Sequence, residues 1–205
     1  MAADLHELVK KLGYDKVNVA GHDIGLMVAY AYAANFGNEV KKVAFLDALL
    51  PGIEPVWSNL RDKLWWFGFF AWQGSGKVVE GKEREFLTKF WPVVGHVTDA
   101  FTKEESEEFI RAYATPGSTA AAFHWFGAFD QDAKDNLAFM KNKLKMPVLT
   151  IGGEYQSASF LGDHFKKVAT DVKEIKIAGA GHWLVQEKTE SVLNGLMEFF
   201  MTGQQ

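Results

Sequence analysis

The sequence predicts an α/β fold in which a parallel sheet is flanked by helices and a helical lid is inserted into the chain. Two observations support this prediction. Strand patterns alternate with helical patterns at both ends of the chain, over residues 1–53 and 136–205. Between them, residues 54–135 lack clear strand patterns and hold all seven tryptophans except Trp183. We therefore expect the two outer segments to form one core and the middle segment to form the lid.

The first outer segment is typical of a helix, a strand, a second helix and a second strand. Leucine and valine recur at helical spacing up to Gly13, where the first helix is expected to end. Residues 16–20 then predict a short buried strand. Residues 24–35 are apolar nearly all round, which predicts a helix buried in a large core. Residues 40–46 give the second strand, and two prolines then break the regular pattern.

The middle segment has a helical and aromatic character. Residues 102–105 read Thr-Lys-Glu-Glu, a capping box that predicts the start of a helix, which stops before Pro116. Beyond the middle segment the alternation resumes. We expect strands over 147–152 and 172–177, and helices over 159–168 and 190–200.

Composition limits the classes of function. The chain has 205 residues, enough for one domain with a buried core, and 48% of them are hydrophobic. The net charge of −4 and the lack of a basic face argue against a nucleic-acid partner. Since no stretch approaches the roughly 20 apolar residues of a membrane span, no membrane partner is expected. The sequence has no cysteine, which excludes disulfides but leaves the compartment unknown, with the cytoplasm as the default.

The most informative motif, Gly21-His-Asp-Ile-Gly25, lies between the first predicted strand and the helix that follows. A nucleophile elbow has the same arrangement with serine at the turn, and here the residue is Asp23. An ionised carboxylate can attack a carbon and form an ester, which a histidine-activated water can then hydrolyse. Aspartate at such a turn is also a common helix N-cap. The motif alone therefore leaves catalysis and capping both open.

Two further residues are expected to complete a site around Asp23. His182 follows a predicted strand in a glycine-rich loop that can bring its imidazole to the cleft. Asp47 ends the strand beside that of Asp23, and the carboxyl ends of parallel strands are where ligands bind. Glu154 is the second choice for the acid, and we favour Asp47. No set of histidines has convincing metal-ligand spacing, and neither a metal nor a cofactor is expected.

Together these motifs resemble the epoxide hydrolase and haloalkane dehalogenase branch of the α/β-hydrolase superfamily. The resemblance implies an α/β-hydrolase fold truncated at its N-terminus, because members place four strands and an oxyanion loop before the helix that opens this sequence. The remaining sheet would have about four strands, and the strand before Asp23 would lie at an edge. The matching stretches run in family order and cover nearly the whole chain: residues 19–25, 46–52, 79–86, 146–152 and 179–184.

The resemblance also implies a chemistry. Asp23 would be the nucleophile, His182 the base that activates the co-substrate water, and Asp47 the acid that orients His182. Fluoroacetate dehalogenases, which carry their acid after the earlier strand, support Asp47. The backbone N–H of Ile24 would be one oxyanion donor. The implied reaction is the opening of an epoxide on a small apolar substrate.

The lid departs from the family pattern where the substrate would bind. Epoxide hydrolases protonate the epoxide oxygen with lid tyrosines, and the matching positions here hold Trp66 and Phe126. Tyr113 is the sole lid tyrosine, and we expect these three residues and Trp65 to contact substrate. Displacement of halide with tryptophan donors is the alternative, although Ile24 replaces the usual halide-binding tryptophan. A non-catalytic remnant that binds an apolar ligand also stays open, as does a homodimer.

Overall fold

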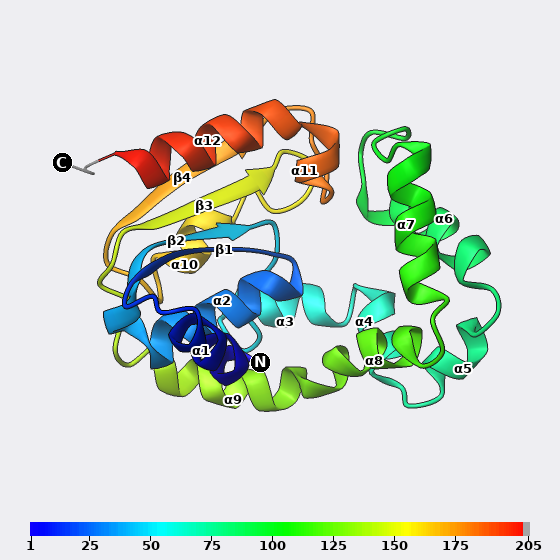
Figure 1. Cartoon of the computed structure of the whole chain (residues 1–205), viewed down its shortest axis with the longest axis horizontal. Helices are drawn as coiled ribbons and strands as arrows, with labels where there is room; N and C mark the ends of the chain where they lie inside the picture. Colours follow the sequence, from blue (N-terminus) through cyan, green and yellow to red (C-terminus); the bar gives the residue numbers. More distant parts are fainter. Residues whose placement is uncertain (203–205) are drawn as a thin grey trace.

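The computed structural model of the chain describes residues 1–202. Its four strands form one sheet in the order β1-β2-β3-β4, and every neighbouring pair is parallel (Figure 1). The prediction of an α/β fold with a parallel sheet is confirmed. The strands are β1 Val17–His22, β2 Val40–Leu46, β3 Val148–Gly153 and β4 Val172–Ile177.

Helices cover both faces of the sheet (Figure 1). Side chains alternate across β2, so that Val43 and Phe45 belong to one apolar cluster and Ala44 and Leu46 to another. The first cluster includes residues of α2 and α10, and the second includes residues of α12. The helices of the two outer segments are α1 Ala2–Lys11, α2 Ile24–Asn35, α10 Leu161–Phe165, α11 Leu184–Glu187 and α12 Thr189–Met201, with a 3-10 turn η1 at Gly37–Glu39.

Two expectations for the outer segments need correction. The first strand is longer than residues 16–20, and its Asn18 and Ala20 are exposed because β1 pairs with β2 alone and lies at the sheet edge. The helix expected over 159–168 is limited to α10, with turns on both sides. The buried helix over 24–35 is confirmed as α2.

All residues between Val56 and Phe139 that adopt regular structure are helical, and we call this stretch the helical insert. Thr102 and Glu105 form the predicted capping box at the start of α7. Aromatic side chains of the insert form a separate apolar cluster around Phe70 and Phe123. The helices are α3 Val56–Arg61, α4 Trp65–Ala71, α5 Ser75–Val79, α6 Glu83–Val94, α7 Lys103–Tyr113, α8 Ser118–His124 and α9 Phe129–Phe139, with a 3-10 turn η2 at Trp125–Ala128.

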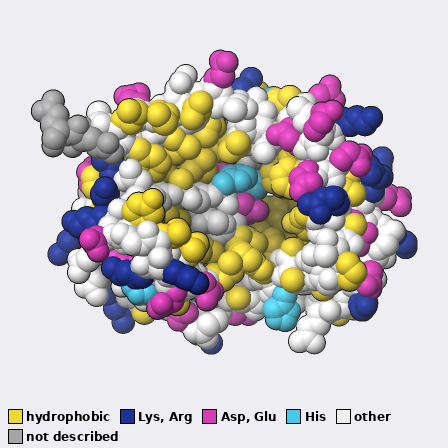
Figure 2. Space-filling view, viewed as in Figure 1, with side chains coloured by type: hydrophobic (Ala, Val, Ile, Leu, Met, Phe, Trp, Pro, Cys, Tyr) yellow, Lys and Arg dark blue, Asp and Glu magenta, His cyan; other side chains and the backbone are white. Residues whose placement is uncertain are grey.

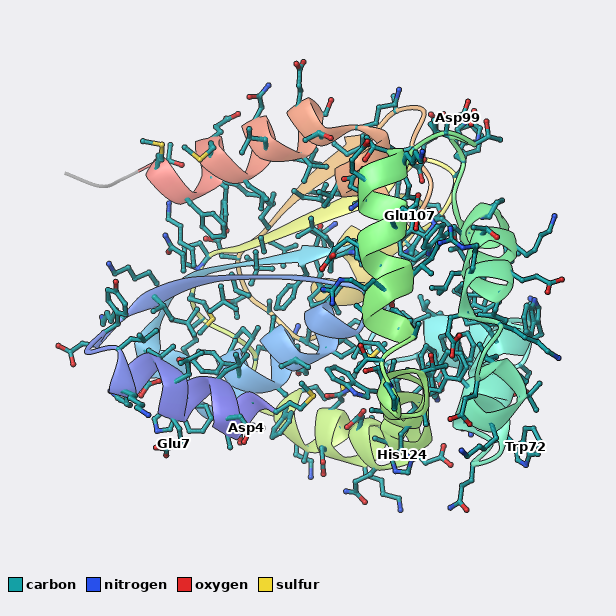
Figure 3. All side chains as sticks on the ribbon, turned by 45° about the vertical axis from the view of Figure 1, so that its right-hand side comes forward. Asp4, Glu7, Trp72, Asp99, Glu107 and His124 are labelled. Atoms are coloured by element: carbon teal, nitrogen blue, oxygen red, sulfur yellow. The ribbon has the colours of Figure 1, made fainter. Side chains whose placement is uncertain are left out.

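The insert stands beyond the carboxyl ends of the strands, and only α9 runs back beneath α2 (Figure 1). Figure 3 shows Trp72 at the outer end of the insert, away from the sheet, and Asp99 in the loop before α7. The inner side of the insert therefore faces the strand ends that hold the predicted site. Among residues 1–202, no helix is long and apolar enough to cross a membrane.

Candidate active site

Asp23 lies at the sharp turn between β1 and α2. Its backbone φ of 55° is unusual for a residue other than glycine, and such values occur where a structure holds a side chain in a set direction. A Cβ on Gly21 would lie 2.1 Å from the carbonyl oxygen of Gly25, so only glycine allows this approach of strand and helix. The Asp23 side chain makes no capping hydrogen bond with α2, which disfavours the capping alternative.

Asp47 follows β2 and is brought beside Asp23 by the register of the sheet. His22 pairs with Leu46, and the N–H of Asp23 donates to the Leu46 carbonyl at 3.2 Å. The Asp47 side chain is 2% exposed. Its Oδ1 accepts hydrogen bonds from the Gly153 N–H at 3.0 Å and from the N–H and hydroxyl of Ser157. Asp47 is therefore fixed by β3 and the turn that follows it.

His182 lies between the two carboxylates. Its Nδ1 is 2.8 Å from Oδ2 of Asp47, and its Nε2 is 3.6 Å from Oδ2 of Asp23. Glu154, the second choice for the acid, instead accepts a hydrogen bond from the Gly179 N–H at 2.8 Å. The structure thus brings Asp23, Asp47 and His182 together and leaves Glu154 outside.

The charges at this site stabilise one another. Burial alone would lower the pKa of His182, but its contacts with Asp23 and Asp47 outweigh burial and raise that pKa to about 10. Burial would raise the pKa of Asp23, yet the contact with His182 and the neighbouring Ile24 N–H hold it below its ordinary value. These contacts favour a protonated His182 imidazole and an ionised Asp23.

His22 joins the turn of Asp23 to the loop of His182. Its Nε2 lies 2.8 Å from the carbonyl oxygen of His182, and the two imidazole rings are 4.7 Å apart. Burial, and then the charge of His182, lower the pKa of His22. A neutral His22 with its proton on Nε2 donates this hydrogen bond. The bond helps to fix the distance between the turn of Asp23 and the loop of His182.

A cavity of about 560 Å³ opens above Asp23 and His182, between the strand ends and the insert. The side chain of Asp23 is 44% accessible and lines this cavity. Figure 2 shows the hollow on this face of the molecule, surrounded by apolar side chains. Three of the four residues that we expected to contact substrate line it: Trp66, Tyr113 and Phe126.

Trp65, the fourth of these residues, lies outside the cavity lining. It is 54% exposed, is not among the residues that line the cavity, and packs edge-on against Trp66. Consecutive residues of a helix point about 100° apart, so α4 can turn only one of the two indoles inward. Ser157, which holds Asp47, is a residue that sequence reasoning missed, because no pattern around it marks a contact 110 residues away. Within residues 1–202, no group of three or more candidate ligands could hold a metal ion.

Comparison with known proteins assigns this chain to a family. The family model described as "alpha/beta hydrolase fold" matches residues 1–189. The chain belongs to the α/β-hydrolase family. This α/β-hydrolase is 31% identical to the soluble epoxide hydrolase of Corynebacterium sp. strain C12, over 98% of the chain and 72% of that protein.

Solved structures agree with this assignment. Wild-type Cfl2 from Burkholderia cenocepacia superposes with a TM-score of 0.88 at 28% identity, covering 97% of this chain and 70% of that one. The epoxide hydrolase CorEH superposes with a TM-score of 0.85 at 26% identity, covering 97% of this chain and 72% of that one. The protein is thus an epoxide hydrolase-like α/β-hydrolase enzyme.

Proposed function

We propose that this α/β-hydrolase opens epoxides on small apolar substrates through a covalent ester on Asp23. The observation that carries the proposal is the placement of His182 between Asp23 and Asp47 at the floor of an apolar cavity. Its likeness to the soluble epoxide hydrolase of Corynebacterium supports epoxides as the substrate class.

In the first step the Asp23 carboxylate attacks an epoxide carbon. The new ester bond forms as the bond from that carbon to the epoxide oxygen breaks, and the leaving oxygen needs a proton. Tyr113 is the proposed donor, because it lines the cavity and its hydroxyl has no hydrogen-bond partner within residues 1–202. Burial, and then the charge of Asp23, raise the pKa of Tyr113, so its proton is retained until the alkoxide develops.

The ester changes the charge around His182. Because the Asp23 ester is neutral, one of the two anions that raise the pKa of His182 is lost, and this pKa falls. The proton that His182 then releases returns Tyr113 from the tyrosinate to its neutral, protonated form. His182 becomes a neutral base only after the first step, which is when a base is needed.

In the second step water hydrolyses the ester. Nε2 of His182 takes a proton from a water molecule, and the resulting hydroxide attacks the carbonyl carbon of the Asp23 ester. Asp47 stabilises the imidazolium that forms, through its contact with Nδ1. The Ile24 N–H is the proposed donor to the oxyanion. When that intermediate collapses, the bond from its carbon to the substrate oxygen breaks and the proton of the newly added hydroxyl passes to that oxygen, which releases the diol and restores the Asp23 carboxylate beside a protonated His182.

The insert is the proposed lid. Residues 54–135 would close over a core formed by 1–53 and 136–205, and Trp66 and Phe126 would supply apolar contacts for the substrate. Trp66 also supports a second candidate, displacement of halide, because this residue lines the cavity and its indole N–H has no hydrogen-bond partner within residues 1–202. Incubation with a bromoalkane, followed by an assay of bromide release, tests that alternative directly.

The test of the proposal is to trap the ester. We expect His182→Gln, incubated with styrene oxide, to accumulate a peptide containing Asp23 whose mass is increased by one substrate molecule. Asp23→Asn is the control and should give neither the adduct nor the diol at early times. Diol formation by Asp23→Asn at the wild-type early rate would rule out the covalent mechanism. A wild-type protein that binds styrene oxide without either product would be the non-catalytic remnant.

A further inference from the structure

The loop that carries His182 is attached directly to the end of α6 in the helical insert. The backbone N–H of His182 donates to the carbonyl oxygen of Val94 at 3.0 Å. The indole N–H of Trp183 donates to the carbonyl oxygen of Trp91 at 2.8 Å. The residue proposed as the base is therefore bonded to the insert through its own backbone.

Glu187 adds a second and stronger connection. Its Oε2 accepts hydrogen bonds from the N–H of Gly181 at 2.7 Å and of Val97 at 3.2 Å. Its Oε1 accepts from the N–H of Trp183 at 3.1 Å, and both oxygens lie 3.3 Å from the His96 nitrogen. One carboxylate thus binds the residues on both sides of His182 and the two residues that follow Gly95 after α6.

The two segments joined by Glu187 are in close contact. A Cβ on Gly181 would lie 2.5 Å from the His96 nitrogen and 2.7 Å from the carbonyl carbon of Gly95. No side chain can separate the backbones here, so a shift of one segment moves the other. Hydrogen bonds to a charged acceptor are roughly twice as strong as neutral ones, so removal of this carboxylate weakens the attachment substantially.

The position of His182 tolerates little movement. Its two ring nitrogens contact two different carboxylates, one at 2.8 Å and the other at 3.6 Å. Asp47 is held by β3 and the turn that follows it, and Asp23 lies in the turn before α2, which the single hydrogen bond of His22 joins to the His182 loop. The loop itself must therefore be fixed from outside, and Glu187 is the side chain with the most hydrogen bonds to it.

We propose that Glu187 is a positioning residue for His182 and that it couples the placement of the imidazole to the position of the insert. The kinetic part of this inference rests on the proposed function. Glu187 contacts neither the cavity nor the two carboxylates, and it acts through the backbone on both sides of His182.

The test separates the two chemical steps. Glu187→Gln keeps the size of the side chain but replaces one acceptor oxygen with an NH₂ group. With styrene oxide in rapid-quench experiments, we expect ester formation within about twofold of wild type and ester hydrolysis slower by roughly 10- to 100-fold. Glu190→Gln, at an exposed position in the first turn of α12, is the charge-matched control and should match wild type in both steps. Thermal melts verify that each variant is folded.

A second measurement does not depend on catalytic turnover. NMR titration of the His182 imidazole reports its contacts with Asp23 and Asp47, and the neighbouring imidazole is that of His22, whose pKa is lowered by burial and by the charge of His182. We expect the midpoint of His182 to fall in Glu187→Gln and to stay unchanged in Glu190→Gln. An unchanged midpoint, or ester hydrolysis at the wild-type rate, would overturn the inference. Failure of the wild-type protein to form the ester would instead overturn the proposed function, and the NMR result alone would then decide the role of Glu187.

Discussion

His182 owes its protonation state to the two carboxylates that flank it. With both ionised, its pKa is raised to about 10, well above the 6.5 of a free imidazole. A raised pKa in the folded protein stabilises the fold fully below pH 6.5, and this contribution is lost as the pH rises through about 10. The same pair of contacts explains how one residue can be a charged partner before the ester forms and a base afterwards.

Asp47→Asn tests the orienting role of the buried carboxylate. We expect the ester to form at close to the wild-type rate and to be hydrolysed roughly 1000-fold more slowly, because an amide neither fixes the tautomer of His182 nor stabilises its cation. Rapid-quench measurement of the adduct on Asp23 checks this. Glu154→Gln is the matched control, since Glu154 contacts Gly179 and not the imidazole. Slower hydrolysis in the control but not in Asp47→Asn would reverse the assignment.

At the scale of single residues, the sequence predicts the site residues that lie in turns containing glycine. Gly21 and Gly25 lie two residues on either side of Asp23, glycines precede His182, and the positions of both residues after strands could be seen without coordinates. The choice between Asp47 and Glu154 depends on which strand-end carboxylate reaches the imidazole, and only coordinates supply that distance. The sequence also does not show which side of α4 faces the cavity, because Trp65 and Trp66 are chemically identical.

At the scale of elements, the turn between β1 and α2 places different demands on its two glycines. A Cβ on Gly21 would overlap the backbone of Gly25 and Leu26, whereas a Cβ on Gly25 meets no atom within 4 Å. We expect Gly21→Ala to lower the free energy of unfolding by about 3 kcal/mol or more. Gly25→Ala should change it by less than about 1 kcal/mol, because alanine is favoured in a helix. Urea unfolding of both variants checks this, and equal losses would contradict it.

His164 links α10 to the chain after β2. Its Nε2 accepts the Leu50 N–H at 2.8 Å, it is 1% exposed, and burial lowers its pKa to about 4. Because the unfolded chain takes up this proton first, the free energy of unfolding falls as the pH drops from about 6.5 to about 4, by about 3 kcal/mol. We expect His164→Gln to show a shallower loss than wild type in urea unfolding over that range. Parallel profiles would show that His164 titrates normally.

The strands could be predicted more closely than the short helices. Each strand is a short segment with several apolar residues, and β2 and β4 begin and end at the expected residues. The first and last residues of the helix after β3 could not be predicted in this way. Residues 157–160 form turns in which the N–H and hydroxyl of Ser157 hold Asp47, and this tertiary contact takes the place of a regular helical start.

At the scale of the whole molecule, the cavity lies between the charged ends of the strands and the aromatic side of the insert. Among residues 1–202, the charged groups that line it are Asp23, Asp47 and His182, and no lysine or arginine of this range lines it. A substrate carboxylate would face two anions and one imidazolium whose ring nitrogens already contact those two anions. We expect kcat/KM for styrene oxide to exceed that for its 4-carboxylate by at least about 10-fold. Equal values for the two epoxides would contradict this view of the cavity.

The central claim is that the first oxygen delivered to the substrate comes from Asp23. A single turnover with excess enzyme in ¹⁸O-labelled water tests it most directly. We expect the diol to carry unlabelled oxygen and the peptide containing Asp23 to gain ¹⁸O, because water attacks the ester carbonyl carbon and not the substrate. A diol labelled in the first turnover, with Asp23 unlabelled, would mean that water opens the ring directly and would contradict the covalent mechanism.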